Sequence, residues 1–200
     1  MRAGDTPREH NAGSAWIMED MVERDRDATG RALNARPRDR FGRPLPPGSQ
    51  GVPRIPDDLN LPPQQTLAFA QQLLDDGLAF NAHEVLEAAW KNGPFAERML
   101  WQGLAQYAVG LTHIQRGNTK GAYTLLDRAI NRLTTFEADF ESDPDYTETA
   151  GETTRPFPYD VDAAGLIAHA RGLLADLEAG LPIPEDRLMP RLCATTSRPG

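Results

Sequence analysis

MLWQGLAQYAVGLTHIQ, residues 99–115, is a run of seventeen positions without a charged side chain. Its apolar residues recur at three- and four-residue spacing and surround nearly the whole circumference of a helix. Such a helix must be covered by its neighbours, so the run predicts the central helix of a bundle. We expect this helix to begin near Pro94 and to end near Arg116, before the Gly117-Asn118 pair.

Two helices are expected before this run. Residues 63–76 carry leucines and alanines at helical spacing. In the next segment Asn81 is suited to cap a helix start, and Glu84 stands three residues later, at the second position of a capping box. We expect that helix to end at Asn92, before the helix-stopping Gly93.

Two further helices are expected downstream. Asn118 is suited to cap the fourth helix, and Gly121 indicates the close approach of a neighbour one turn later. An acidic linker over residues 137–159 follows, and Asp160 is suited to cap a fifth helix that ends at Gly180. Because no segment shows the two-residue alternation of a strand, the sequence predicts an all-α fold, a single bundle of about five helices with antiparallel helix pairs.

Proline separates this helical body from the rest of the chain. Nine of the 17 prolines fall in residues 1–63 and seven at position 144 or beyond, so Pro94 stands alone in the 80 residues between. Proline removes a backbone donor and clashes inside a helix, so this stretch of 80 residues is where long helices can form. The expected organisation is a disordered or loosely packed arm at 1–60, a helical domain at 61–181 that includes the linker 137–159, and a tail at 182–200.

Charge follows the same division. Residues 1–63 hold ten basic and ten acidic side chains, so the whole net charge of −8 belongs to the remaining 137 residues. An acidic body disfavours binding to nucleic acid or to an anionic membrane, and no apolar stretch approaches the length of about 20 residues that a membrane span requires. Residues 24–43 are locally basic, with seven arginines. We interpret them either as a solvated arm or as a strap that packs on the acidic body or on a partner.

Several chemistries have no motif in the chain. The single Cys193 excludes an internal disulfide framework and a cysteine-only metal site in a monomer. The first twenty residues lack the apolar run of a secretory signal, so a reducing cytoplasm is expected. There is no glycine-rich phosphate loop, nucleophile elbow or paired CxxC motif, so the common nucleotide-binding and hydrolase readings are not supported and no cofactor is predicted.

Polar side chains on the second and third predicted helices form a candidate site. At about 100° per residue, His83 and Glu87 share one face of the second helix. Gln102 and Gln106 share a face of the third. If the two faces meet, they form a polar pocket made of His83, Glu84, Glu87, Arg98, Gln102, Gln106 and His113.

Three interpretations of this pocket remain open. The favoured one is structural hydrogen bonding that fixes the packing, followed by a site for a small polar ligand. The third is a divalent metal held by two histidines and a carboxylate, although no metal is predicted as the main interpretation. HEVLE departs from HExxH at the last ligand, so Glu84 takes no general-base role from that motif.

The remaining histidines and aromatic residues are interpreted without a functional role. His10 and His169 are isolated in the sequence and are expected to face solvent. Four aromatic residues are expected to lie in the core: Trp90, Trp101, Tyr107 and Tyr123.

Residues 80–133 carry an ordered set of short motifs: His83-Glu84 with Glu87 and Trp90, Gln102-Gly103 with Gln106, then His113, Gly117-Asn118, Gly121-Ala122 and Leu125-Leu126. This set resembles the domain of unknown function family 309, a small all-α family of bacteria and archaea. NARPRDRFGRPLPPG, residues 34–48, is similar to the N-terminal arm of actinobacterial members. The resemblance implies an all-α fold and a cytoplasmic setting, and it assigns no catalytic residues.

The sequence therefore favours a binding or interaction module. Its expected partner is a small ligand, a protein or a second copy of the chain, and neither nucleic acid nor a membrane is expected. The alternative is a small-molecule hydrolase or metal-dependent enzyme that uses His83, Glu84, Glu87 and His113.

Overall fold

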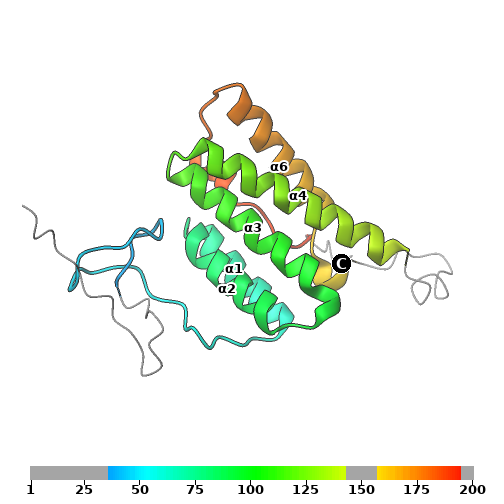
Figure 1. Cartoon of the computed structure of the whole chain (residues 1–200), viewed down its shortest axis with the longest axis horizontal. Helices are drawn as coiled ribbons and strands as arrows, with labels where there is room; N and C mark the ends of the chain where they lie inside the picture. The colour runs from blue at the N-terminus through cyan, green and yellow to red at the C-terminus, as the bar shows by residue number, and fades with distance from the viewer. Residues whose placement is uncertain (1–35, 143–156, 195–200) are drawn as a thin grey trace, which may run out of the picture. The chain divides into compact units, whose positions relative to one another are not determined.

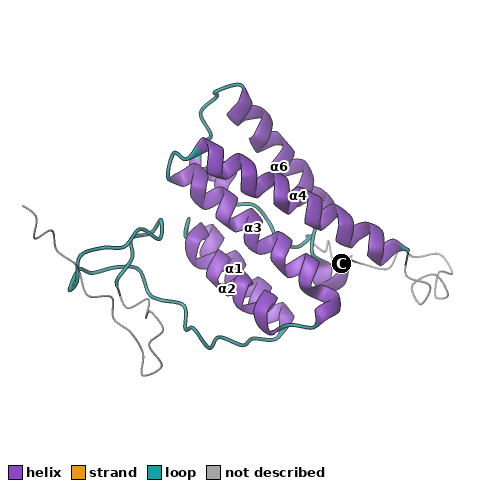
Figure 2. Cartoon of the chain, in the orientation of Figure 1, coloured by secondary structure: helices purple, strands orange, loops and turns teal. Residues whose placement is uncertain are grey.

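A computed structural model of the protein describes residues 36–142 and 157–194. Both ranges belong to one compact unit that begins at Arg36. Figure 2 shows helices joined by loops, and no strand is present within the described ranges, so the prediction of an all-α bundle is confirmed. Residues 1–35, with most of the basic segment and His10, lie outside the described residues, as do most of the expected acidic linker and the end of the expected tail.

The bundle is a series of helices in which each packs on the next (Figure 1). α1 packs on α2, α2 on α3, α3 on α4, and α4 on α6. Their bounds are α1 Pro63–Asp75, α2 Ala79–Asn92, α3 Arg98–Gln115, α4 Thr119–Glu141 and α6 Ala163–Glu178. Three single turns of 3₁₀ helix complete the order: η1 Phe95–Glu97, η2 Pro158–Asp160 and η3 Glu185–Leu188.

The uncharged run forms α3, the central helix. Ten of its eighteen residues are buried. Two of these are glycines on the side that meets α4. A Cβ on Gly110 would lie 2.7 Å from the Leu126 side chain, and one on Gly103 would lie 3.0 Å from Leu133. The small residues let the two helices approach closely, which explains why α4 is the helix that contacts α3 most extensively.

Two of the three predicted helix caps are wrong. α2 begins at Ala79, and the Asn81 side chain inside it donates to the Pro53 carbonyl (2.9 Å) instead of capping the helix. Asp162 rather than Asp160 caps α6, since its carboxylate accepts from the Gly165 amide (2.9 Å). The cap of α4 is confirmed, because the Asn118 side chain accepts from the Gly121 amide (2.9 Å).

Both flanks of the helices make tertiary contacts. Before α1, the chain runs along α2, where Asn92 Nδ2 donates to the Leu59 carbonyl (3.2 Å). After α6, Leu188 and Leu192 are buried in the same core as the helices. The Asp162 amide donates to the Leu192 carbonyl (2.9 Å), which ties this last segment to the start of α6.

Aromatic residues and His169 are only partly where the sequence suggests. Trp101 and Tyr107 are fully buried, as predicted, but Tyr123 is 41% exposed. The expectation that His169 faces solvent is wrong. Its Nδ1 lies 2.6 Å from the Tyr107 hydroxyl, because α6 packs this face of the bundle, and burial lowers its pKa. None of the helices within the described ranges combines the length and the apolar character needed to cross a bilayer.

Candidate functional site

The predicted polar residues of α2 lie beside one another. His83 Nε2 is 3.8 Å from Glu87 Oε2, and Lys91 Nζ is 3.1 Å from the other Glu87 oxygen. Burial lowers the pKa of His83, although the Glu87 carboxylate acts in the opposite direction. His83 is therefore a largely neutral imidazole near pH 7, and its Nδ1 lies 3.1 Å from the Phe80 carbonyl.

The predicted polar residues of α3 find other partners. Gln102 Oε1 accepts from Arg132 Nε of α4 (2.8 Å), and His113 Nδ1 lies 3.0 Å from Asn118 Nδ2 in the α3–α4 turn. Arg98 reaches α2, where its guanidinium lies 5.7 Å from the centre of the Trp90 ring. The described contacts therefore join His83 to Glu87, but they join neither residue to Gln102 or His113.

Gln106 and Glu84 complete the predicted set. Gln106 Oε1 is buried and has no hydrogen-bond partner among the described residues. Burial raises the pKa of Glu84, while the nearby Arg38 and Arg54 act to lower it. Glu84 therefore lies close to residues of the segment that precedes α1. Within the described part of the chain, no group of three His, Cys, Asp or Glu side chains is arranged to hold a metal ion.

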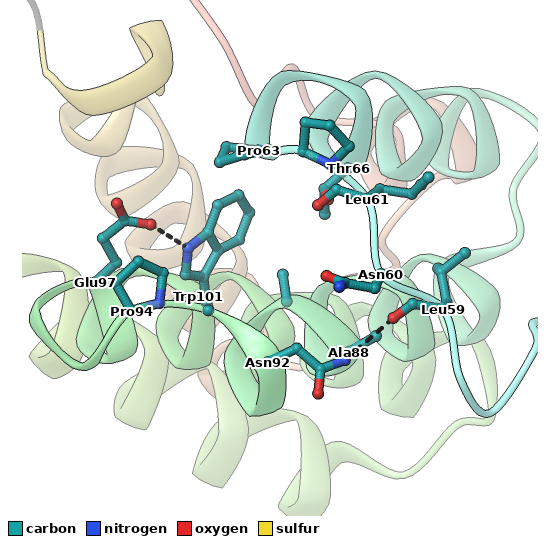
Figure 3. Close-up of a pocket in the computed structure, with 13 residues that line it drawn as sticks. Leu59, Asn60, Leu61, Pro63, Thr66, Ala88, Asn92, Pro94, Glu97 and Trp101 are labelled. Carbon is teal, nitrogen blue, oxygen red and sulfur yellow. Dashed lines mark hydrogen bonds between the residues drawn. The ribbon is translucent and has the colours of Figure 1, made fainter.

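A cleft of about 380 Å³ lies between the segment that enters α1 and the turn that joins α2 to α3 (Figure 3). Figure 3 shows the Trp101 indole, Thr66, Leu61 and Asn60 around the same space. Prolines form much of the remaining wall. Proline suits both loops because it cannot continue a helix. The lining residues are Leu59, Asn60, Leu61, Pro62, Pro63, Thr66, Ala88, Ala89, Asn92, Gly93, Pro94, Glu97 and Trp101.

Short hydrogen-bonded links hold the two loops in place. The bond from Asn92 to the Leu59 carbonyl joins the end of α2 to the entering segment. Thr66 Oγ1 donates to the Leu61 carbonyl (3.3 Å), which fixes the chain where it turns into α1. A side chain at Gly93 would place its Cβ 2.6 Å from the Ala89 carbonyl oxygen, so the turn after α2 requires a residue without one.

Glu97 is the charged residue of the cleft, and two aromatic donors hold it. Trp101 Nε1 donates to Glu97 Oε2 (2.9 Å), and the Tyr159 hydroxyl donates to Oε1. Burial, together with the bond to Glu97, raises the pKa of Tyr159 to about 12. Tyr159 is therefore a donor at every physiological pH, and the carboxylate keeps a fixed orientation.

The Tyr159 backbone is left-handed, with φ 61° and ψ 22°, and Asp160 follows with φ 59°. Residues other than glycine adopt this conformation at a cost of about 1–3 kcal/mol, so the surrounding structure must impose it. The Ala194 amide donates to the Asp160 carbonyl (2.9 Å), and Val161 and Cys193 form an isolated bridge. The segment after α6 thus holds the turn that presents Tyr159 to Glu97.

Sequence reasoning missed this cleft. Tyr159 lies 62 residues from Glu97, so no spacing rule connects them. One signal was available: Pro62-Pro63 opens the first helix, and Asn92-Gly93-Pro94 separates the second from the third. Consecutive antiparallel helices place these two turns at the same end of the bundle.

Part of the helical core is similar to a known protein family. Residues 67–125 match the family described as "Domain of unknown function (DUF309)". "Uncharacterized protein YpuF" of Bacillus subtilis (strain 168) is 44% identical over 55 residues, which are 27% of this chain and 32% of that protein. The match spans about a third of that relative's length. No solved structure matches. The matched range runs from within α1 to within α4, and it includes Glu97 and Trp101 but neither Tyr159 nor the segment that enters α1.

Proposed function

We propose that this protein is a small-molecule-binding module and that its ligand occupies the cleft beside Glu97. One observation carries the proposal: a carboxylate held by two aromatic donors stands at the edge of a cleft whose lining combines leucine, proline and alanine with a few polar side chains. Ligand sites commonly have this composition, with a mostly apolar wall and a few oriented polar groups. The volume of about 380 Å³ suits a small metabolite.

The charge of the lining indicates the class of ligand. Glu97 is its one ionisable side chain, and the lining holds no lysine, arginine or histidine. Each carboxylate oxygen has two lone pairs and accepts one bond from the protein, so each retains a further acceptor direction. A ligand with an ammonium or another N–H donor satisfies that direction, whereas an anionic ligand meets repulsion.

Binding is favoured over catalysis by what surrounds Glu97. The lining holds no histidine, cysteine or lysine that would serve as nucleophile or as a partner in proton transfer, and the Thr66 hydroxyl donates to a backbone carbonyl. Glu97 itself is directed by Trp101 and Tyr159. The carboxylate therefore supports recognition of a ligand and lacks the neighbours that acid–base chemistry requires.

A thermal-shift screen of the full chain tests the proposal. The probes are small primary amines and amino alcohols, with carboxylic acids of matched size as the opposite charge class. We expect amines to raise the unfolding temperature and carboxylates to leave it unchanged, because a ligand that binds the folded state alone stabilises it.

Two variants decide whether Glu97 is responsible. Glu97→Gln removes the charge from the cleft, and Glu141→Gln removes the same charge from an exposed position at the end of α4. Dissociation constants of the best amine are expected to rise about tenfold in Glu97→Gln and to stay within about twofold of wild type in Glu141→Gln. Equal affinity in the two variants, or no amine that binds, would overturn the proposal.

A further inference from the structure

Residues 38–44, which precede α1 in the chain, form a tight turn. Arg38 and Pro44 form an isolated bridge at its base, and Gly42 takes a left-handed conformation with φ 74°. Asp39 Oδ1 accepts from the amides of Phe41 (2.9 Å) and Arg43 (2.8 Å). These bonds give the turn a defined shape.

The turn is fixed to both α2 and α3. Gly42 lies against the Phe80 ring so closely that a Cβ on it would come within 2.2 Å of the ring. From the end of α3, two N–H groups of Arg116 donate to the Phe41 carbonyl, Nε at 2.7 Å. The turn is therefore a part of the folded unit and presents its side chains from a rigid base.

Four guanidinium groups lie over two phenyl rings in this region. Arg38 and Arg116 lie over the Phe80 ring, at 5.3 and 5.6 Å from its centre. Arg40 and Arg43 lie over the Phe41 ring, at 5.4 and 5.5 Å. Stacking on a ring restricts a long side chain before any ligand arrives, which lowers the entropy cost of binding. We call these four residues, Arg38, Arg40, Arg43 and Arg116, the arginine cluster.

Three members of the arginine cluster form no ion pair with a described carboxylate, whereas Arg38 lies near the Glu84 carboxylate. Ion pairs between described residues do not include Arg40, Arg43 or Arg116. Burial lowers the pKa of Arg116, and Arg43 and Arg38 lower it further, while Asp39 acts in the opposite direction. The Asp39 carboxylate oxygen that points into the turn is already bonded to two backbone amides. An anion bound here would relieve the mutual repulsion of the guanidinium groups.

We propose that the arginine cluster binds the phosphate group of a small phosphate ester. Guanidinium groups bind phosphate oxygens through paired N–H donors, and the exposed Arg40 and Arg43 are accessible to a ligand. A small ligand is favoured over a long polyanion because the chain carries a net charge of −8, which repels an extended phosphate backbone.

This site is separate from the cleft of the proposed function. Phe80 lies in the first turn of α2, and Asn92 of the cleft is its last residue. The fourteen residues of the helix separate the two regions by about 20 Å at 1.5 Å per residue. The two proposals therefore stand or fall independently.

Isothermal titration of the full chain with phenyl phosphate and with inorganic phosphate, at constant ionic strength, tests the proposal. Arg40→Gln/Arg43→Gln removes two exposed charges from the cluster. Arg128→Gln/Arg171→Gln removes two exposed charges from α4 and α6 and serves as the matched control. We expect saturable binding by the wild type, a dissociation constant at least about tenfold higher in the cluster variant, and a change within about twofold in the control.

The two phosphate probes, together with a third titration with RNA, distinguish the possible sources of the anion. Binding of phenyl phosphate and inorganic phosphate with similar affinity identifies the phosphate group itself as the ligand, which supports the proposal. The absence of saturable binding, or equal weakening in both double variants, would overturn it. A single-stranded RNA that binds far more tightly than phenyl phosphate and depends steeply on salt would also overturn it, because the cluster would then be a nucleic-acid surface.

Discussion

Tyr159 shows how one residue connects distant parts of the chain to the cleft. Its hydroxyl donates to Glu97, its ring centre lies 5.9 Å from that of Trp101, and its backbone is held left-handed by the segment after α6. A hydrogen bond to a charged group contributes about 1.5–3 kcal/mol when it is shielded from water. Partial exposure of Tyr159 places its contribution near the lower end of that range.

Tyr159→Phe is accordingly expected to lower the free energy of unfolding by about 1–2 kcal/mol, measured by urea denaturation. Tyr123→Phe is the matched control, since its hydroxyl bonds Glu178 on the exposed surface, where such bonds add little stability. If both variants lose the same free energy of unfolding, the bond to Glu97 stabilises the protein no more than an exposed hydrogen bond does.

The histidines predict a pH dependence. Burial lowers the pKa of His83, His113 and His169, so the unfolded chain binds more protons than the folded one below the ordinary histidine value of about 6.5. Stability is therefore fully present above that pH and falls as the pH decreases through it. Glu84 acts in the opposite direction at lower pH, because its pKa is raised.

For His83→Gln, unfolding free energies at pH 7.0 and 5.5 are expected to differ less than in the wild type. Burial, Lys91 and Arg116 lower the pKa of His83, and Glu87 acts in the opposite direction. His83 therefore contributes part of the pH dependence of stability. If the unfolding free energies at the two pH values differ as much in His83→Gln as in the wild type, His83 titrates in the folded protein as it does in the unfolded chain. The same variant also tests the enzymatic alternative. If His83 were catalytic, His83→Gln would lose turnover while the protein stayed folded.

Among the elements, the α3–α4 pair depends on glycine. Alanine normally stabilises a helix interior relative to glycine, but a Cβ at Gly110 would lie 2.7 Å from Leu126. Gly110→Ala is therefore expected to destabilise the protein by about 1–3 kcal/mol in chemical denaturation. Gly172→Ala on α6 meets the end of the flexible Arg187 side chain at 3.2 Å and should be neutral or stabilising. If both variants have the same stability, the close helix approach is not important for the fold.

Elements were predictable from the sequence to the extent that their signals are local. The uncharged run identified α3, and the Asn118 side chain identified the start of α4, because periodicity and capping depend on neighbours within one or two turns. Asn81 was wrongly predicted to cap α2, because its side-chain amide donates to the carbonyl of Pro53, 28 residues earlier in the chain. The Tyr107–His169 contact was missed for the same reason, since its partners are 62 residues apart.

The polar pocket predicted from the second and third helices forms only in part. His83 and Glu87 form the expected pair, since one helical turn joins them. Whether the facing side chains of two helices meet depends on how the helices are rotated about their axes, which no local pattern specifies. Gln102 accordingly bonds α4, and the cleft of Glu97 arises from loops that the sequence presents far apart.

For the whole molecule, the turn at residues 38–44 is expected to be joined to the bundle through Gly42. Gly42→Ala forces a Cβ into the Phe80 ring and should release the turn, so that trypsin cleaves after Arg38 and Arg40 faster than in the wild type. Gly48→Ala has a similar positive φ but open space around it, and it serves as the control. Equal cleavage rates in the two variants would contradict this account of the turn.

A ligand with an N–H donor is expected to bind beside Glu97, and the indole N–H of Trp101 reports on this binding directly. In a titration with the best amine followed by ¹H–¹⁵N NMR, the Trp101 indole signal is expected to shift saturably, because this N–H bonds the carboxylate that receives the ligand. The Trp90 indole, which does not line the cleft, should remain unchanged. A ligand that shifts both signals equally, or that binds without moving the Trp101 signal, would contradict the account.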